Sequence, residues 1–200
     1  LLGGAAAHAD KSGGTLSFLV QPEPPTLASY VSTSGPIGLV MPKVYEGLFD
    51  YNNDGTMVPI LAESYSASAD GKTVTFNRRK GVKWHDGKPF TSADVQFTAM
   101  EMWKKILNYG STLQLFLDAV DTPDAHTAIF RYSRPMPLNL LLRALPDLVY
   151  VSAKHVYEGT DIRQNPANTA PMGTGPFRFV QYERGQFIIA DRNPNYWRNN

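Results

Sequence analysis

Residues 44–100 decide the fold, and they read VYEGLFDYNNDGTMVPILAESYSASADGKTVTFNRRKGVKWHDGKPFTSADVQFTAM. Asp70-Gly71 separates two short strand patterns, and on the return strand Val74 and Phe76 alternate with threonines. Gly71 tolerates a positive φ, which the tight turn of a hairpin requires. The centre of this stretch therefore predicts a β-hairpin.

A capped helix is predicted directly after the hairpin. Thr91 is a typical N-cap residue, and Asp94 stands three positions later, where its carboxylate completes a capping box. Apolar residues then recur at helical spacing on one face: Val95, Ala99, Met102 and Ile106. Hairpin and helix together predict one packed α/β unit.

The order of motifs in this stretch is more specific than its periodicity. Five motifs follow one another: YEGL at 45–48, LAESY at 61–65, DGKTVTF at 70–76, GVKWHDGKPF at 81–90 and TSADV at 91–95. This succession resembles the extracellular solute-binding proteins of peptide and nickel ABC importers, the family of the dipeptide- and oligopeptide-binding proteins. GTGP at 173–176 and NPNYW at 193–197 extend the resemblance over nearly all of residues 13–197.

The resemblance implies an α/β fold of the periplasmic binding protein type (type II), of which this chain forms a part. Family members are considerably longer, so we expect the amino-terminal portion, without the second main lobe that supplies much of the ligand pocket. The implied division is a signal-peptide remnant over 1–9, a first segment of main lobe I over 10–45, an accessory α/β domain over 46–172 and a return into main lobe I over 173–200.

The composition is that of an ordinary globular protein. Of 200 residues, 42% are hydrophobic and 18% charged, and the net charge of +1 predicts no strong field for nucleic acid or an anionic membrane. Arg78-Arg79-Lys80 is the only run of three positive charges, and we interpret it as a solvated strand end. The absence of cysteine excludes disulfides, thiolate zinc sites, a cysteine nucleophile and, within these residues, a lipid-bearing cysteine. No apolar run approaches the roughly 18 to 20 residues that span a bilayer.

The first nine residues, LLGGAAAHA, are small and apolar. They are typical of the end of a secretory signal peptide that is cleaved after Ala9, although a floppy Ala/Gly tail explains them equally well on their own. Together with the family resemblance they favour export. We therefore expect a mature protein that begins at Asp10 and is soluble in the periplasm.

Outside the opening stretch, periodicity and proline predict further elements. An alternating strand is expected over 14–20, followed by a proline-stiffened loop over 21–25. A helix is expected over 34–48, with Ser34 available as a cap and with Pro42 making it short or kinked. Three further elements follow from apolar patterns: a strand over 126–132, a short helix over 138–145 and a buried strand over 147–151.

The resemblance supplies the first candidate ligand contacts. It places the loop after the first strand at the border of the ligand cleft, which makes wall residues of Glu23, Pro24, Pro25 and Thr26. The residues alone favour a stiff connector with a solvated Glu23. Tyr45 is a further candidate, although a half-buried position at a helix end is the more common role of such a tyrosine.

Later candidates lie on loops. The nickel-binding branch of the family has a ligand-facing loop near Tyr109 and Thr112, but with Arg and Trp where this chain has Asn, Tyr and Gly, which argues against the same metal complex. Asp147 could accept a hydrogen bond from a ligand amine, while capping the backbone or lying in water is the more common role. Thr174 and Gly175 belong to GTGP, where glycines permit close approach by a ligand or another strand.

The sequence contains no recognisable catalytic motif. The four histidines are far apart in sequence, and no nucleophile elbow, Walker loop or dinucleotide fingerprint occurs. Trp84-His85-Asp86 is the one sequence that suggests an acid/base pair, but Asp86-Gly87 is typical of a turn. We therefore expect no enzyme, cofactor or metal.

The function that the resemblance implies is the substrate-binding component of an ABC importer. Such a component captures a peptide or a similar small solute in a cleft between lobes and delivers it to the permease transmembrane subunits, here as a monomer without nucleic acid. Two alternatives are a hydrolase that uses Trp84, His85 and Asp86, and a ligand-sensing domain of a regulator. The ligand remains open among peptides, nickel complexes, opines and sugars, and we expect these residues alone to bind it weakly.

Overall fold

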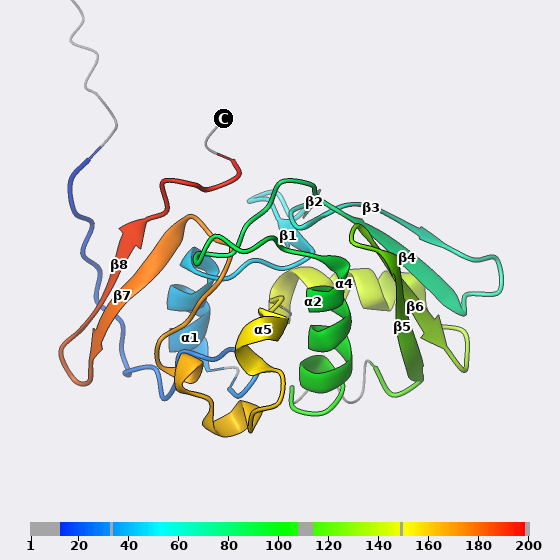
Figure 1. Ribbon diagram of the computed structural model, residues 1–200. Helices are drawn as coiled ribbons and strands as arrows, with labels where there is room; N and C mark the ends of the chain where they lie inside the picture. Colours follow the sequence, from blue (N-terminus) through cyan, green and yellow to red (C-terminus); the bar gives the residue numbers. More distant parts are fainter. Residues whose placement is uncertain (1–12, 33, 108–113, 149, 199–200) are drawn as a thin grey trace, which may run out of the picture.

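The computed structural model describes residues 13–32, 34–107, 114–148 and 150–198 (Figure 1). The helices are α1 (Gly35–Val40), α2 (Ser92–Phe97), α4 (Leu138–Leu148) and α5 (Lys154–Tyr157), with 3-10 turns at Met41–Lys43, Ile162–Gln164 and Pro166–Asn168 and a π-helical turn at Thr98–Trp103. The strands are β1 (Phe49–Tyr51), β2 (Met57–Pro59), β3 (Ala62–Ala67), β4 (Thr73–Arg78), β5 (Leu117–Asp124), β6 (Thr127–Tyr132), β7 (Phe177–Glu183) and β8 (Phe187–Arg192).

The largest sheet has four antiparallel strands in the order β3-β4-β6-β5. Val74 on β4 pairs with Phe130 on β6, and both side chains are buried. Helix α2 packs beside β5 and β6, as Figure 1 shows. Two smaller hairpins, β1-β2 and β7-β8, complete the mixed helix and sheet architecture, which confirms the predicted α/β class.

The central stretch folds as predicted. Strands β3 and β4 form the hairpin, and Gly71 in its turn has a φ of +67°. The capping box is also present, because the Thr91 amide donates a 2.8 Å hydrogen bond to the Asp94 carboxylate. The expected apolar face of the helix is buried at Val95 and Met102, but the helix changes to π-helical geometry at Thr98, which periodicity did not predict.

Two expected strands are wrong. Residues 14–20 are extended, but none of the described strands pairs with them, so no ladder forms and Leu16 remains 87% exposed. The strand expected over 147–151 does not begin at 147, because α4 continues to Leu148 with Pro146 inside it. A short apolar run fits a buried helix and a buried strand equally well, which explains this error. Tyr150 forms an isolated bridge with Gly47 instead.

Arg78 corrects the interpretation of the basic run. Its side chain is 6% exposed, and its guanidinium donates to the carbonyl oxygens of Ala125 at 2.5 Å and Arg79 at 2.6 Å. Arg78 is therefore a buried residue that links β4 to Ala125 by a hydrogen bond, and not a solvated strand end.

The helix after Ser34 is short, as Pro42 implied, although the Ser34 side chain makes no capping hydrogen bond.

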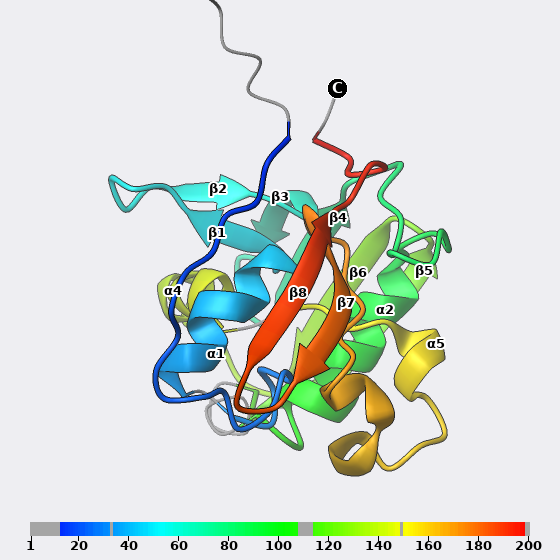
Figure 2. The same cartoon turned by 90° about the vertical axis from the view of Figure 1, so that its left-hand side faces the viewer.

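The apolar interior divides into two clusters. The smaller cluster joins α1 and its flanks to the β7-β8 hairpin, which lies against α1 in Figure 2, and its buried members are Leu27, Ile37, Val40, Met41 and Tyr45. Phe179, Tyr182 and Ile188 of the hairpin pack on it. The larger cluster comprises most of the remaining interior. The larger cluster also takes in Ala28 and Tyr30, so the clusters do not follow the division at 45 and 173, which remains a prediction.

No helix in the described ranges is long and apolar enough to cross a membrane.

Candidate ligand-binding site

Glu46 is the centre of a buried junction. Glu46 follows α1 in the chain and is only 8% exposed. Its carboxylate accepts hydrogen bonds from Thr174 Oγ1 at 2.8 Å, Tyr196 Oη at 2.7 Å and Trp197 Nε1 at 2.9 Å. Burial raises the pKa of Glu46, and the three donors oppose that rise. Three motifs of the chain thus meet on one carboxylate.

His85 contacts the segment at 173–175, called the crossover below, through the backbone of both of its glycines. Its Nε2 lies 3.0 Å from the carbonyl oxygen of Gly175, and its Nδ1 accepts a 3.2 Å hydrogen bond from the Gly173 amide. The His85 amide also donates to the Gly173 carbonyl oxygen at 2.9 Å. The WHDG motif therefore contributes a fixed contact to GTGP.

Both glycines of the crossover are required by its close approach to the Val44 backbone. The Gly175 amide donates a 2.9 Å hydrogen bond to the Val44 carbonyl oxygen. A Cβ atom at Gly173 would lie 1.9 Å from that oxygen, and one at Gly175 would lie 2.6 Å from it. No side chain fits at these distances, so the turn at Val44 occupies the space that each glycine leaves.

Three sequence-predicted candidates therefore come together in the interior. Tyr45 is 2% exposed and its ring stacks on Tyr150 with centroids 6.1 Å apart. Burial raises the pKa of Tyr45, and the neighbouring Tyr157 contributes to the rise. Thr174 is 1% exposed, and its hydroxyl is occupied by Glu46. Gly175 is also buried, and its amide donates to the Val44 carbonyl oxygen.

The loop that carries Glu23 lies elsewhere, against the β7-β8 hairpin. The exposed Glu23 carboxylate accepts hydrogen bonds from Tyr182 Oη at 2.7 Å and from the Gly185 amide at 2.9 Å. The Gly185 bond and then the Tyr182 bond lower the pKa of Glu23. Pro24 is buried and Pro25 is exposed, so this loop shows one face to solvent.

Asn168, which the sequence did not single out, fixes the far end of that loop. Its carbonyl oxygen accepts from the Leu27 amide at 2.9 Å and from Thr26 Oγ1 at 3.1 Å. Its side-chain oxygen accepts from Tyr30 Oη, and its side-chain nitrogen donates to the Ile162 carbonyl oxygen at 2.9 Å. Thr26 and Tyr30 lie more than 130 residues from Asn168 in sequence, so no local pattern could reveal this role.

The remaining candidates are placed only in part. Tyr109 and Thr112 lie outside the described residues. Asp147 belongs to the last turn of α4, and the position of its side chain is not described. As ligand contacts, these residues and the others predicted from sequence remain predictions.

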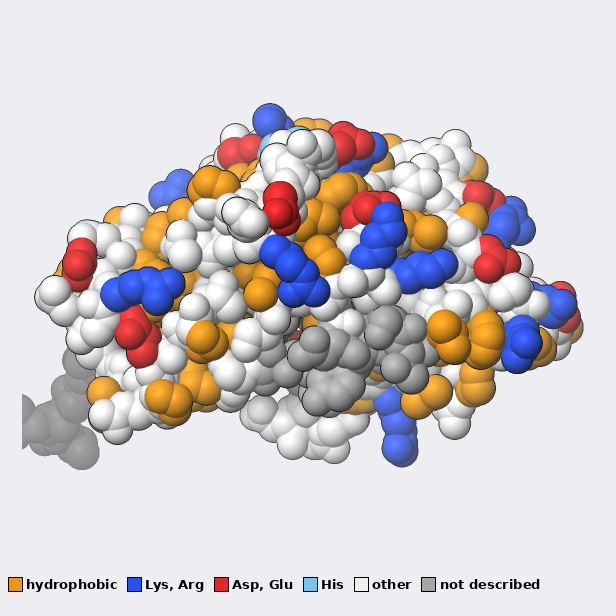
Figure 3. Space-filling view, turned by 90° about the horizontal axis from the view of Figure 1, so that it is seen from below, with side chains coloured by type: hydrophobic (Ala, Val, Ile, Leu, Met, Phe, Trp, Pro, Cys, Tyr) orange, Lys and Arg blue, Asp and Glu red, His pale blue; other side chains and the backbone are white. Residues whose placement is uncertain are grey.

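Two hollows mark the described surface. One of about 500 Å³ lies between α2, the π-helical turn, β5 and α5, and one of about 580 Å³ is lined by Arg178, Asp191, Arg192 and Pro194. Neither is lined by a described candidate residue. Seen from below, basic and acidic side chains are interspersed over the described part of that face (Figure 3).

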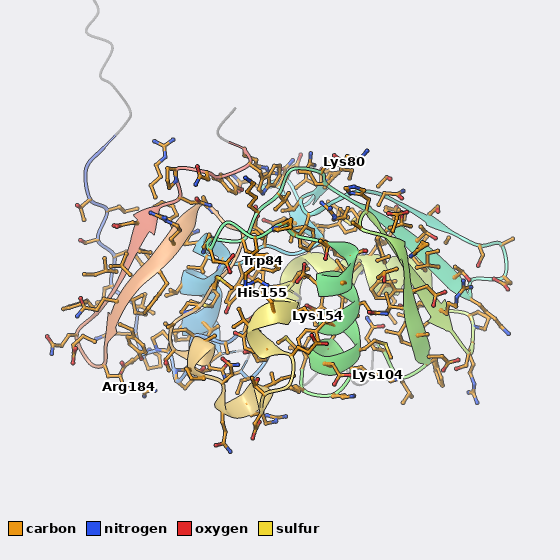
Figure 4. All side chains as sticks on the ribbon, viewed as in Figure 1. Lys80, Trp84, Lys104, Lys154, His155 and Arg184 are labelled. Atoms are coloured by element: carbon orange, nitrogen blue, oxygen red, sulfur yellow. The ribbon has the colours of Figure 1, made fainter. Side chains whose placement is uncertain are left out.

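Trp84, His85 and Asp86 do not converge on an acid/base pair. Asp86 turns to His155, whose Nε2 lies 2.8 Å from its carboxylate, while His85 is engaged with the glycines. The Trp84 ring lies edge-on to His155 with centroids 6.4 Å apart, near the centre of Figure 4. Within the described ranges, no group of three or more His, Asp or Glu is placed to hold a metal ion.

Comparison with protein families gives a match to "Bacterial extracellular solute-binding proteins, family 5 Middle" over residues 56–200. The glutathione-binding protein GsiB of Pectobacterium atrosepticum is 30% identical over 158 residues, which cover 77% of this chain and 29% of that protein. Di/tripeptide-binding protein 2 of Pseudomonas aeruginosa is 30% identical over 164 residues, which cover 72% of this chain and 30% of that protein.

Solved structures of the same kind superpose well. NikZ from Campylobacter jejuni in complex with Ni(L-His) aligns with a TM-score of 0.78 and 25% identity, over 90% of this chain and 36% of NikZ. AppA from Bacillus subtilis in complex with a nonapeptide aligns with a TM-score of 0.77 and 28% identity, over 87% of this chain and 35% of AppA. The chain spans less than a third of the length of the curated relatives that it matches. It belongs to the bacterial extracellular solute-binding proteins of family 5, with the type II periplasmic binding protein fold.

Proposed function

We propose that this chain is part of the substrate-binding component of an ABC importer. That component captures a peptide or a similar small solute and delivers it to the permease subunits in the membrane, and it acts in the periplasm as a monomer. The observation that carries the proposal is the family match over residues 56–200. Relatives that bind glutathione, di/tripeptides and a nonapeptide support a peptide ligand.

The exposed side of the loop from Glu23 to Thr26 is the ligand-facing wall in this proposal. Tyr182 holds one end of the loop and Asn168 holds the other, so the wall is fixed before a ligand arrives. A wall that is already ordered loses less conformational entropy on binding. Tyr109, Thr112 and Asp147 complete the proposed set of contacts.

Tyr45, Thr174 and Gly175 have a supporting role in the proposal. Their buried contacts fix the crossover and the return hairpin behind the wall. The ligand is then captured by domain closure: it contacts both lobes and so favours their closed arrangement. The closed form is the one that the permease recognises.

Titration calorimetry on the protein at its natural length tests the proposal. The probes are dialanine, trialanine and glutathione, and we expect saturable one-site binding of at least one of them. Glu23→Gln should weaken that binding, while Glu63→Gln, which changes an exposed carboxylate on β3, should leave it unchanged. Absence of binding by all three probes, or equal effects of the two substitutions, would contradict the proposal.

A further inference from the structure

The His85 ring occupies an unusual position between two glycines of one crossover. Gly173 offers an N–H at 3.2 Å from Nδ1, and Gly175 offers a carbonyl oxygen at 3.0 Å from Nε2. An N–H can only donate and a carbonyl oxygen can only accept. The two neighbours therefore fix the protonation of the ring, with a bare Nδ1 and a proton on Nε2.

Protonation of the ring breaks one of these contacts. An imidazolium carries protons on both nitrogens, so Nδ1–H would face the Gly173 N–H, donor against donor. The Gly173 amide then loses its acceptor. The contact between Nε2 and the Gly175 carbonyl oxygen survives, so protonation of the ring disrupts only its contact with Gly173.

We propose that His85 is a pH-sensitive positioning residue, whose neutral ring with the proton on Nε2 holds residues 173–175 against the Val44 backbone and whose protonation loosens that hold. The crossover carries Thr174 to Glu46 and Gly175 to Val44, so its position sets how the β7-β8 hairpin meets the chain at 44–46. This inference concerns the fold of the crossover and holds whether or not the proposed ligand is correct.

The surroundings of the ring favour the neutral form. Burial lowers the pKa of His85 below the usual histidine value of 6.5, and the hydrogen bond to Gly175 opposes that change. Two charged side chains act on the ring from different elements: Arg178 on β7 lowers its pKa, and Asp86 in the same turn raises it. Asp86 is itself occupied by His155 and Lys88, and these contacts outweigh burial to lower the pKa of Asp86.

Histidine-ring ¹⁵N NMR on the full chain tests the inference, with His85→Gln used to assign the ring. At pH 7.5 we expect an unprotonated Nδ1 and a protonated Nε2, and on acidification a midpoint below 6.5. The amide signal of Gly173 should shift with the same midpoint. A proton on Nδ1 at pH 7.5, or a Gly173 signal that does not follow His85, would overturn the proposal.

His155→Gln is the matched control, because His155 is a second histidine close to His85 and contacts Asp86, the residue next to His85. The Gly173 titration should persist in this variant and disappear in His85→Gln. If His155→Gln abolishes it, the proposal is wrong. Should His85→Gln fail to fold, the ring signals of the wild type together with this control still decide the question.

Discussion

Thr174 Oγ1 donates a 2.8 Å hydrogen bond to the carboxylate of Glu46, a residue 128 positions earlier in the chain, and both side chains are buried. Tyr196 and Trp197 donate to the same carboxylate. The motifs YEGL, GTGP and NPNYW are therefore neighbours in space. Their contacts join the segment after α1 to the segments on either side of the β7-β8 hairpin.

Replacement of Glu46 by Gln should destabilise this junction. Glutamine offers one acceptor oxygen to three donors, and its own amide donates, so we expect the free energy of unfolding to fall by about 2 kcal/mol. Chemical denaturation of the wild type and the variant measures this difference in the free energy of unfolding. A double-mutant cycle with Thr174→Val should give a coupling energy of about 1 kcal/mol or more, and a coupling near zero would show that the two groups act independently.

Gly173→Ala should be among the most destabilising single changes. The added Cβ would lie 1.9 Å from the Val44 carbonyl oxygen, so the backbone must move, at a cost of about 3 kcal/mol or more. Gly38→Ala is the control, because Gly38 lies in α1 with no atom near its missing Cβ and should gain up to about 1 kcal/mol from helix propensity. Equal melting temperatures for the two variants would refute the close-approach argument.

Asn168→Ala should loosen the loop that ends at Thr26. The substitution removes the side-chain bonds to Tyr30, Ile162 and Arg163 and leaves buried partners unsatisfied, for a loss of about 2 kcal/mol or more. Hydrogen exchange should rise over residues 26–30. Unchanged exchange there would mean that packing alone holds the loop.

Acid should weaken the fold through His85. Because the pKa of His85 in the fold lies below 6.5, the unfolded chain binds a proton more readily, so this contribution is fully present above pH 6.5 and is lost as pH falls below it. Denaturation from pH 7.5 to 5 should show a smaller loss of stability in His85→Gln than in the wild type. Parallel curves would contradict the prediction.

Local elements could be predicted because their causes are local. The turn at Gly71 and the capping box of Thr91 and Asp94 depend on residues a few positions apart. The prediction of a strand over 14–20 was wrong because a strand depends on a distant pairing partner, and alternation alone does not supply one. The π-helical turn at Thr98–Trp103 adds a residue to a helical turn without changing the apolar pattern enough to reveal it.

The candidate site was harder to predict than the fold. Family resemblance pointed to GTGP, but the reason for its glycines, the approach to Val44, lies in backbone geometry. The role of Glu46 depends on partners 128 to 151 residues away. The sequence favours a scaffold role for His85 over a catalytic one, and in the structure both ring nitrogens contact the backbone of Gly173 and Gly175.

Native mass spectrometry of the protein at its natural length, purified without denaturation, tests the central proposal that the protein binds a small solute without converting it chemically. We predict a complex with one small solute that is released with its mass unchanged after prolonged incubation. Conversion of that solute to a product of different mass, or a protein that remains free of any solute in the presence of excess dialanine, trialanine and glutathione, would contradict the claim.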